Sequence, residues 1–327
     1  VKEEYCEGCK TKELRKTISR LIEMLIVLKK DDLYNNEEQK KVEPFVQKIE
    51  KNKSNGLFVG VGDSGIILTS SNGTVWTQRS SGTTNRLYGV TYGKGIFVTV
   101  GMYGTILTSQ NGSSWENNSS KKFGHINQVI FGNDIFVAVG EWGNVLTSLD
   151  GENWTKINSN FSKYLGGVTY GNRLFLSVGY SGTILSSIDG SSWTKRTTGT
   201  RDLLQGVTHG KDNFITVSSR GNIFSSSDGI SWIKRTSGTK TFLNAVNYGN
   251  DNFATVGLNG LILTSIDGIS WVKRDTGISS NLFGITSGKG IMVAIGESGT
   301  ILTSSDSKTW ILRESHYKNL YGINFSK

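Results

Sequence analysis

Seven tryptophans recur at a constant interval of 39 residues, and this period constrains the fold more than any other feature of the sequence. They are Trp76, Trp115, Trp154, Trp193, Trp232, Trp271 and Trp310. Whole stretches around them repeat: "SIDGSSWTKRTTGT" at 187–200 is nearly identical to "SSDGISWIKRTSGT" at 226–239. A period of this length is typical of proteins built by repeating one small unit. Seven units fill residues 55–327, so we expect two parts, 1–54 and 55–327.

Each repeat contains four short runs with the composition of β-strands. In residues 87–118 they are "LYGVTYG", "IFVTVG", "TILTS" and "SSWENN", with Gly and Asn turns between them. The runs are apolar on both faces, as expected for a sheet that is covered on both sides. Four strands in each unit of about 40 residues predict an all-β fold, a seven-bladed β-propeller of four-stranded blades.

The two ends of the repeat region predict a closed ring. The first unit begins with "NGLFVGVGDSG", which matches the second strand of the other units, so its first strand is missing. The chain ends with "LYGINFSK" at 320–327, which matches "LYGVTYGK" at 87–94. An open ring would expose two sheet edges, which proteins avoid. We therefore predict that the C-terminal strand completes the first blade.

The charge of the chain is positive but not concentrated. The formal net charge is +9, of which residues 1–54 carry +2 and the repeats carry +7. Nucleic-acid-binding proteins usually gather basic residues in a stripe, so we expect no nucleic-acid partner, while attraction to anionic polymers stays open. No stretch of about 20 apolar residues exists, which predicts no membrane insertion. The N-terminus lacks the layout of a signal peptide, so we expect synthesis in the cytoplasm.

The first 54 residues differ in kind from the repeats and predict a short α-helical segment. Leu14, Ile18, Leu21, Leu25 and Leu28 form a heptad seam on a helix from about 11 to 30. A second helix is expected in "EPFVQKIEKN" at 43–52, with a proline near its first turn. These helices either fold back on the propeller or associate with other chains. We favour the second interpretation, an attachment device for protein assembly.

Cys6 and Cys9 are the two cysteines of the chain, and both precede the repeats. A Cys-x-x-Cys pair supplies at most half of a four-ligand zinc site. Two free or locally paired thiols are the simpler interpretation. We therefore expect no metal site and no cofactor.

A short motif precedes each repeated tryptophan and resembles the Asp box of BNR-repeat propellers. The seven copies are "SSNGTVW", "SQNGSSW", "SLDGENW", "SIDGSSW", "SSDGISW", "SIDGISW" and "SSDSKTW". They are one residue shorter than the familiar box, and the last copy has Ser307 in place of Gly. The resemblance covers 55–327 and is greatest to propellers of the photosystem-assembly-factor type, while sialidases share the box and the architecture. It implies a seven-bladed propeller.

The Asp box is interpreted as a structural turn. Its Asp or Asn can accept backbone N–H bonds, and its Gly can adopt a conformation closed to other residues. The alternative, seven calcium sites, is disfavoured because each turn has one carboxylate or amide while calcium takes six to eight oxygens. Function is therefore expected where the copies differ.

The copies differ in the turn between the second and third strands and in the links between blades, which should share one face. The two free turn residues are Asp63-Ser64, Met102-Tyr103, Glu141-Trp142, Tyr180-Ser181, Ser219-Arg220, Leu258-Asn259 and Glu297-Ser298. The candidate ligand-binding residues on this face are Tyr103, Trp142, Tyr180, Phe123, His125, Phe161, Tyr164, Arg201, Arg220 and Lys240. Aromatic faces with a few polar groups suit stacking on sugar rings. Alternatively, each aromatic side chain covers a neighbouring loop.

We expect no enzymatic activity and no catalytic residues. The Arg-Ile-Pro motif of sialidases is absent, and Arg86, Arg201 and Arg220 do not follow the family pattern. Glycoside hydrolysis needs two facing carboxylates. Asp63 and Glu297 occupy equivalent turns of neighbouring blades, but solvated turn residues are the simpler interpretation.

The sequence favours a non-enzymatic recognition propeller on a helical anchor. The expected setting is a phage tail or tailocin-type particle that binds a bacterial surface glycan or receptor outside the cell. The alternative is an intracellular, cytoplasmic assembly factor that docks a protein partner. A second alternative is a glycosidase.

Overall fold

The structure, a computed structural model, describes residues 56–313 and 317–326. The predicted helices at 11–30 and 43–52, the heptad seam and the cysteine pair lie outside these residues. Within the described residues, no helix is long and apolar enough to cross a membrane.

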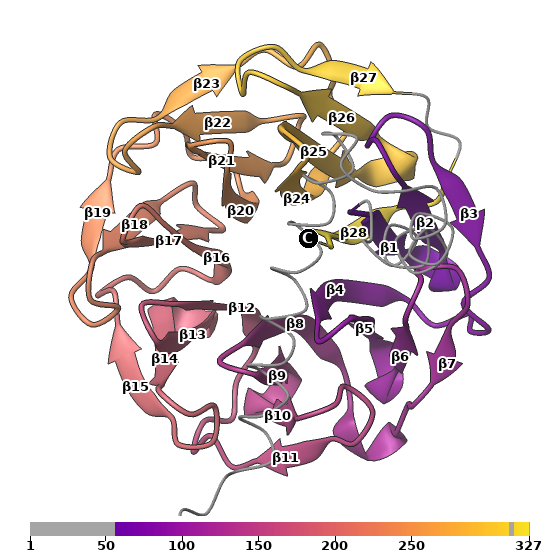
Figure 1. Ribbon diagram of the computed structural model, residues 1–327. Helices are drawn as coiled ribbons and strands as arrows, with labels where there is room; N and C mark the ends of the chain where they lie inside the picture. Colours follow the sequence, from indigo (N-terminus) through magenta and orange to yellow (C-terminus); the bar gives the residue numbers. More distant parts are fainter. Residues whose placement is uncertain (1–55, 314–316, 327) are drawn as a thin grey trace, which may run out of the picture. The chain divides into compact units, whose positions relative to one another are not determined.

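Seven antiparallel sheets of four strands each surround a central axis, as predicted (Figure 1). Blade one contains β28 (Leu320–Phe325), β1 (Phe58–Gly62), β2 (Ile67–Ser70) and β3 (Thr77–Arg79). Blade two contains β4 (Leu87–Gly93), β5 (Ile96–Gly101), β6 (Ile106–Ser109) and β7 (Glu116–Asn117). Blade three contains β8 (Ile126–Gly132), β9 (Ile135–Gly140), β10 (Val145–Ser148) and β11 (Thr155–Ile157). Blade four contains β12 (Leu165–Gly171), β13 (Leu174–Gly179), β14 (Thr183–Ser187) and β15 (Thr194–Thr197).

The remaining three blades follow in chain order, each with its innermost strand first. Blade five contains β16 (Leu204–Gly210), β17 (Asn213–Ser218), β18 (Ile223–Ser226) and β19 (Ile233–Arg235). Blade six contains β20 (Leu243–Gly249), β21 (Asn252–Gly257), β22 (Ile262–Ser265) and β23 (Val272–Arg274). Blade seven contains β24 (Leu282–Gly288), β25 (Ile291–Gly296), β26 (Ile301–Ser304) and β27 (Ile311–Arg313). Short 3-10 turns are η1 (Asp63–Gly65), η2 (Met102–Gly104), η3 (Lys121–Phe123), η4 (Glu141–Gly143), η5 (Tyr180–Gly182) and η6 (Glu297–Gly299).

The predicted closure of the ring is confirmed. β28 pairs antiparallel with β1, with Phe325 opposite Phe58 and Ile323 opposite Gly60. Beyond the strand, the backbone N–H of Ser326 donates to the carbonyl oxygen of Leu57 over 2.9 Å. The C-terminal strand thus takes the innermost place of blade one, where it lies between the innermost strands of blades seven and two.

The hydrophobic core lies between neighbouring blades, with one cluster for each pair of blades. A phenylalanine, or Met292 in blade seven, occupies the same position of every second strand and is almost fully buried. The repeated tryptophan packs beside it; the rings of Phe58 and Trp76, for example, have centroids 6.3 Å apart. The period of 39 residues therefore places the same large side chains at every blade interface.

The outermost strands are largely exposed and carry charged and polar side chains, together with a few exposed apolar ones such as Val272 and Ile311. Their arginines bend back onto hydroxyls of the third strand, as when Arg235 Nε donates to Ser225 Oγ over 2.7 Å. Such charged edge strands hinder edge-to-edge pairing with other chains.

The repeated box forms the turn that its residues predict. In the box of blade five, Ser226 Oγ accepts the N–H of Gly229 over 2.8 Å. Asp228 Oδ1 accepts the N–H groups of Ile230 and Ser231 over 2.7 and 2.8 Å. Trp232 Nε1 donates to the carbonyl oxygen of Gly229 over 3.3 Å. In blade seven, Ser307 adopts a positive φ of 60° where other boxes have Gly, and Trp310 Nε1 has no partner among the described residues.

The box aspartates predict a loss of stability in acid. Hydrogen bonds to the charged carboxylate lower the pKa of each box aspartate. Backbone N–H groups are the main donors, and they lower the pKa of Asp228 to about 2. At Asp150 the side chain of Asn153 contributes most. The five are Asp150, Asp189, Asp228, Asp267 and Asp306. Because each folded pKa lies below the usual 3.8, the stabilisation is present above about pH 4 and is lost as pH falls toward 2.

We therefore expect the melting temperature to fall between about pH 4 and pH 2, although solvent screening at these exposed carboxylates reduces the effect of each one. Replacing all five aspartates with Asn should flatten this dependence, because Asn72 already accepts the same two backbone bonds in blade one. Calorimetry of both proteins across this range is the measurement. An equally steep fall in the Asn variant would contradict the assignment.

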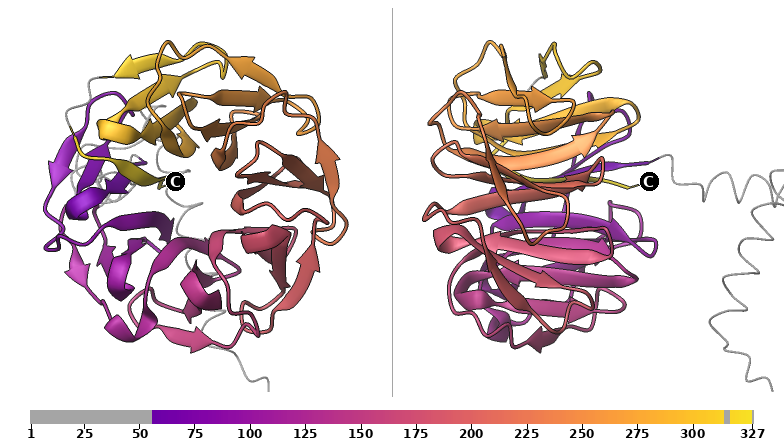
Figure 2. Two further views of the ribbon diagram at one scale, coloured as in Figure 1. Left: turned by 180° about the vertical axis from the view of Figure 1, so that it is seen from behind. Right: turned by 90° about the vertical axis from the view of Figure 1, so that its left-hand side faces the viewer.

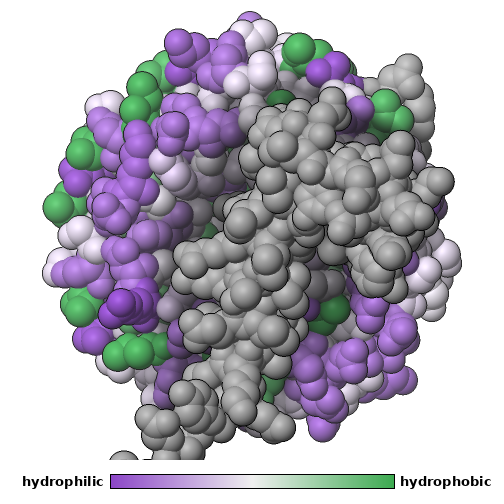
Figure 3. Space-filling view, in the orientation of Figure 1, coloured by the Kyte–Doolittle hydropathy of each residue, from purple (hydrophilic) through white to green (hydrophobic). Residues whose placement is uncertain are grey.

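The ring has two different faces. We call one of them the Asp-box face, because it carries the seven boxes. The end of β28 lies on the same face: Phe325 pairs with Phe58, and Phe58 pairs in turn with Ser70, the first residue of a box. The edge-on view in Figure 2 places the C-terminal end of the chain on one side of the ring. In Figure 3 apolar side chains form separate spots along the rim among polar ones. The opposite face, the turn-and-link face, carries the second turns and the links between blades.

Candidate functional site

The innermost strands of the seven blades line a central cavity of about 440 Å³. The second residue of each innermost strand lies toward the turn-and-link face and varies from blade to blade. We call these residues the mouth ring: Tyr321, Tyr88, Asn127, Gly166, Gln205, Asn244 and Phe283. Two residues further along each strand, a Val or Ile forms an apolar ring beneath them.

In six of the seven blades a small residue, Gly or Ala, lies between these two rings and allows the innermost strands to approach one another closely, whereas blade three has Gln128 there. A Cβ on Gly322 would lie 2.6 Å from the carbonyl oxygen of Tyr88 in the next blade. One on Gly284 would lie 2.8 Å from the carbonyl oxygen of Tyr321. Real Cβ atoms do not approach this closely, so the cavity keeps its width only while glycine stays at these positions.

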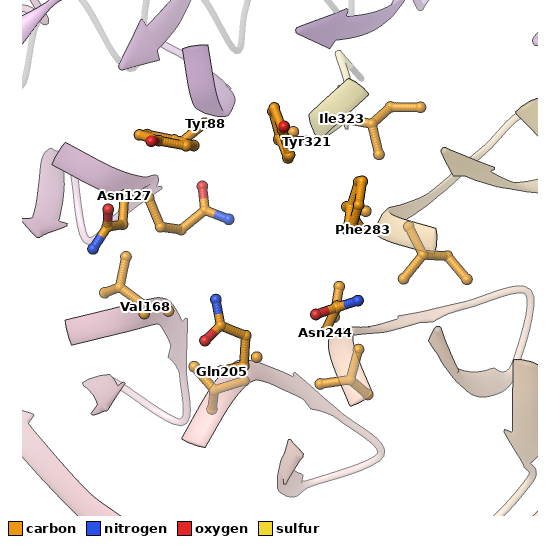
Figure 4. Close-up of a pocket in the computed structure, with 18 of the residues that line it drawn as sticks. Tyr88, Asn127, Val168, Gln205, Asn244, Phe283, Tyr321 and Ile323 are labelled. Atoms are coloured by element: carbon orange, nitrogen blue, oxygen red, sulfur yellow. The ribbon is translucent and has the colours of Figure 1, made fainter. Parts of the chain in front are cut away.

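Three consecutive blades contribute aromatic side chains to the mouth ring. We call Phe283, Tyr321 and Tyr88 the aromatic wall; they lie along one side of the cavity (Figure 4). The ring centroids of Phe283 and Tyr321 are 5.2 Å apart, and those of Tyr88 and Tyr321 are 5.8 Å apart. Aromatic pairs at these distances add attraction beyond the burial of their area, so the wall is a preformed apolar surface.

An ion pair between Arg86 and Asp63 contacts Tyr321 of the aromatic wall. Arg86 pairs with Asp63, and its guanidinium lies 5.0 Å from the ring centre of Tyr321. The Tyr321 hydroxyl donates to Asp63 Oδ2 over 3.2 Å. Burial raises the pKa of Tyr321, with the Asp63 charge acting in the same direction, so this hydroxyl stays protonated at neutral pH.

Amide side chains occupy the other side of the mouth, and we call Asn127, Gln205 and Asn244 the amide wall. Asn127 Nδ2 donates to the carbonyl oxygen of Leu165 over 2.8 Å, and Asn244 Nδ2 donates to that of Leu282 over 2.7 Å. These bonds fix the amide orientation. Within residues 56–313 and 317–326, no hydrogen bond uses the side-chain oxygens of these three amides. They therefore offer acceptors to a ligand.

The structure places the predicted tips Tyr103, Trp142 and Tyr180 on the turn-and-link face, with exposed fractions of 55, 82 and 52%. Tyr103 packs against His125, with ring centroids 5.0 Å apart. The ammonium of Lys163 lies 5.1 Å from the ring centre of Tyr180. Two of the three tips thus already contact a neighbouring link, as the alternative interpretation of the sequence predicts.

The predicted aromatic residues of the links have different environments. Phe123 is only 6% exposed and belongs to the hydrophobic cluster between blades two and three, so its ring packs in the core instead of facing solvent. Phe161 is half-buried against the next cluster. Tyr164 lines the central cavity, where its hydroxyl accepts a bond from Gln205 Nε2 over 3.1 Å. Burial raises the pKa of Tyr164.

The predicted basic residues Arg201, Arg220 and Lys240 are all exposed. Arg220 Nε lies 3.6 Å from Oδ1 of Asp202, a carboxylate that is 5% exposed. Asp202 also accepts from Asn222 Nδ2 over 2.6 Å and from Ser218 Oγ over 3.1 Å. Asp202 was not singled out in the sequence, although it lies in a link next to the one blade whose second turn lacks its leading glycine.

The two carboxylates considered for catalysis have structural partners. Asp63 accepts from Arg86 and from Tyr321. Glu297 Oε2 accepts the backbone N–H of Asn281 over 3.1 Å. Neither lies on the amide wall.

The mouth ring was missed in the sequence, although a signal was present. The innermost strands read "LYGVTYG", "INQVIFG", "LGGVTYG", "LQGVTHG", "LNAVNYG", "LFGITSG" and "LYGINF". Their first and fourth letters are almost constant, whereas the second changes in nearly every blade. A variable position inside an otherwise uniform strand indicates a side chain that the fold does not require.

No protein-family model matches the sequence, and no curated protein matches it. Solved structures of similar fold do. YCF48 bound to D1 peptide has a TM-score of 0.63 at 17% identity, over 75% of this chain and 86% of that one. YCF48 from Cyanidioschyzon merolae has a TM-score of 0.56 at 20% identity, over 72% and 88%. The computationally designed Ika8 protein has a TM-score of 0.61 at 12% identity, over 82% and 87%. Membership in the BNR-repeat family stays a prediction, while the similarity establishes the propeller fold.

Proposed function

We propose that this chain is a non-enzymatic propeller that docks a protein partner by holding an extended segment of it at the mouth ring. The observation that carries the proposal is the division of the ring into an aromatic wall and an amide wall on opposite sides of one cavity. Aromatic faces bind apolar side chains, and amide groups pair with peptide backbone.

The size of the cavity favours a segment over a folded domain. A volume of about 440 Å³ is within the range of ligand pockets and admits one or two side chains. The interblade bonds of Asn127 and Asn244, and the ion pair beside Tyr321, hold both walls before a ligand arrives. Preorganised groups lower the entropy cost of binding. YCF48, which shares the fold, has been solved bound to D1 peptide, and this supports a peptide as the kind of ligand.

Replacing Phe283 with Asn tests the proposal. Asn occupies the same strand position in Asn127 and Asn244, so we expect the melting temperature to change by less than about 2 °C. A displayed library of random 16-residue peptides, selected against the full chain, supplies the probes. Phe283→Asn should lower the affinity of the selected peptides at least about tenfold by fluorescence anisotropy, since a buried aromatic contact is lost.

Val272→Asn is the matched control, because it removes an exposed apolar side chain from the outermost strand β23. It should leave peptide affinity unchanged. Failure of the library to yield any binder, or equal effects of the two substitutions, would refute docking at the mouth ring.

A surface glycan is the second candidate ligand, favoured by the 82% exposure of Trp142 on the same face. A glycan array probed with the full chain is the test, and binding to sugars with no selected peptide would favour this candidate. Attachment to a phage-tail or tailocin-type particle, and action outside the cell, stay predictions, because the residues expected to make the attachment precede those described.

A further inference from the structure

Trp142 has an unfavourable backbone conformation for its residue type. It adopts a φ of 58° and a ψ of 32° at the tip of η4, which is the left-handed region. Bulky side chains rarely occupy this region, whereas Asn does so several times more often than other residues. Six of the seven second turns share this conformation at the position, with Ser64, Ser181, Asn259 and Ser298 among them, whereas Arg220 of blade five does not. Most blades therefore use small or amide residues there.

Nothing within the described part of the chain offsets the strain at Trp142. Tyr103 shares the conformation, but its ring packs on His125 and its backbone N–H donates to His125 Nδ1 over 3.3 Å. Trp142 is 82% exposed, and no ring, cation or hydrophobic cluster of residues 56–313 and 317–326 packs against it. A strained residue that the surrounding structure does not need points to a functional role.

Trp142 adjoins a residue of the cavity lining. Its neighbour Glu141 lines the central cavity, and the backbone N–H of Glu141 donates to the carbonyl oxygen of His125 over 3.2 Å, so the turn is fixed beside the cavity. A segment bound at the mouth and leaving across blade three would therefore lie close to Trp142. Exposed tryptophans in such positions are frequent hot spots of protein interfaces.

We infer that Trp142 is an anchor of the partner interface, on which an apolar side chain of the docked protein packs. The inference rests on the proposed function and extends it from the cavity to the rim of blade three. The strain at Trp142 is then a cost that the free protein carries and that partner contact offsets. Replacing Trp142 should therefore stabilise the free protein and weaken partner binding, a combination that is not expected for a residue that only supports the fold.

Trp142→Asn is the test, and Asn259→Trp, the reverse exchange in blade six, is the matched control. Trp142→Asn should raise the melting temperature of the full chain by about 2–4 °C, because Asn tolerates the left-handed conformation. It should also lower the affinity of the selected 16-residue peptides at least about tenfold. Asn259→Trp should lower the melting temperature by a similar amount and leave peptide affinity unchanged.

The outcomes separate this inference from the proposed function. Peptides whose binding depends on Phe283 but not on Trp142 would overturn the anchor and leave docking at the mouth intact. A fall in melting temperature for Trp142→Asn would also overturn it, by showing that Trp142 supports the turn. If the array shows saturable glycan binding that Trp142→Asn abolishes, the anchor belongs to a carbohydrate site instead. If no peptide binds at all, both proposals fail.

Discussion

Replacing Gly62 with Ala should lower the free energy of unfolding by about 3 kcal/mol or more, a large effect for adding one methyl group. Gly62 ends β1 with a φ of −170°, an extended conformation that any residue adopts. The reason is space: a Cβ there would lie 1.9 Å from the carbonyl oxygen of Asn319 and 2.9 Å from Cα of Leu320. Both atoms belong to the C-terminal segment, so the clash exists only if that segment completes blade one.

Gly60→Ala is the control within the same strand. A Cβ at Gly60 would meet nothing closer than a ring atom of Trp76 at 3.8 Å, an ordinary contact. Its cost should stay below about 1 kcal/mol. Gly101→Ala, which would clash with the carbonyl oxygen of Arg86 at 2.1 Å inside blade two, should match Gly62→Ala. Urea unfolding of the three variants decides the matter, and equal stability of Gly62→Ala and Gly60→Ala would place the C-terminal strand elsewhere.

The sequence predicted the fold well because the fold is made of interactions that repeat. One period of 39 residues places Trp beside a Phe, or beside Met292 in blade seven, at every blade interface and an Asp-box turn with Asp or Asn at every outer hairpin. Seven copies of a weak strand signal together predict an architecture that one copy could not. The closure could be predicted because the first unit lacks its innermost strand and the chain ends with a matching one. The avoidance of unpaired sheet edges gives the physical reason.

The candidate site was predicted less well because it depends on interactions that do not repeat. The link residue Phe123 reads like a surface aromatic, yet it is buried because the short turn η3 directs it into the cluster between blades two and three. Tyr164 lines the cavity, where its hydroxyl accepts a bond from Gln205 of the next blade. The sequence does not single out the mouth ring, because residues within a strand pattern are expected in the core. In a propeller, however, the innermost strands also line the central cavity.

Asp202 is the clearest non-repeating interaction, and its removal should be costly. In blade five Ser218 stands where most second turns begin with Gly, and the buried carboxylate of Asp202 accepts from Ser218 Oγ and Asn222 Nδ2. Asp202→Ala removes the acceptor of both donors, of which Ser218 is fully buried and Asn222 half-buried. We expect a loss of about 2–4 kcal/mol in the free energy of unfolding, measured by urea denaturation.

Arg220→Ala separates the two roles that Asp202 can have. The Arg220 side chain is 79% exposed and its Nε lies 3.6 Å from Asp202 Oδ1, so the ion pair is worth at most about 0.5 kcal/mol. If Asp202 instead served to position Arg220 for a ligand, the two substitutions would have similar, small effects on stability. A large loss for Asp202→Ala alone means that the carboxylate holds the turn of blade five. Arg220 is then free to leave Asp202 and contact a partner without loss of the fold.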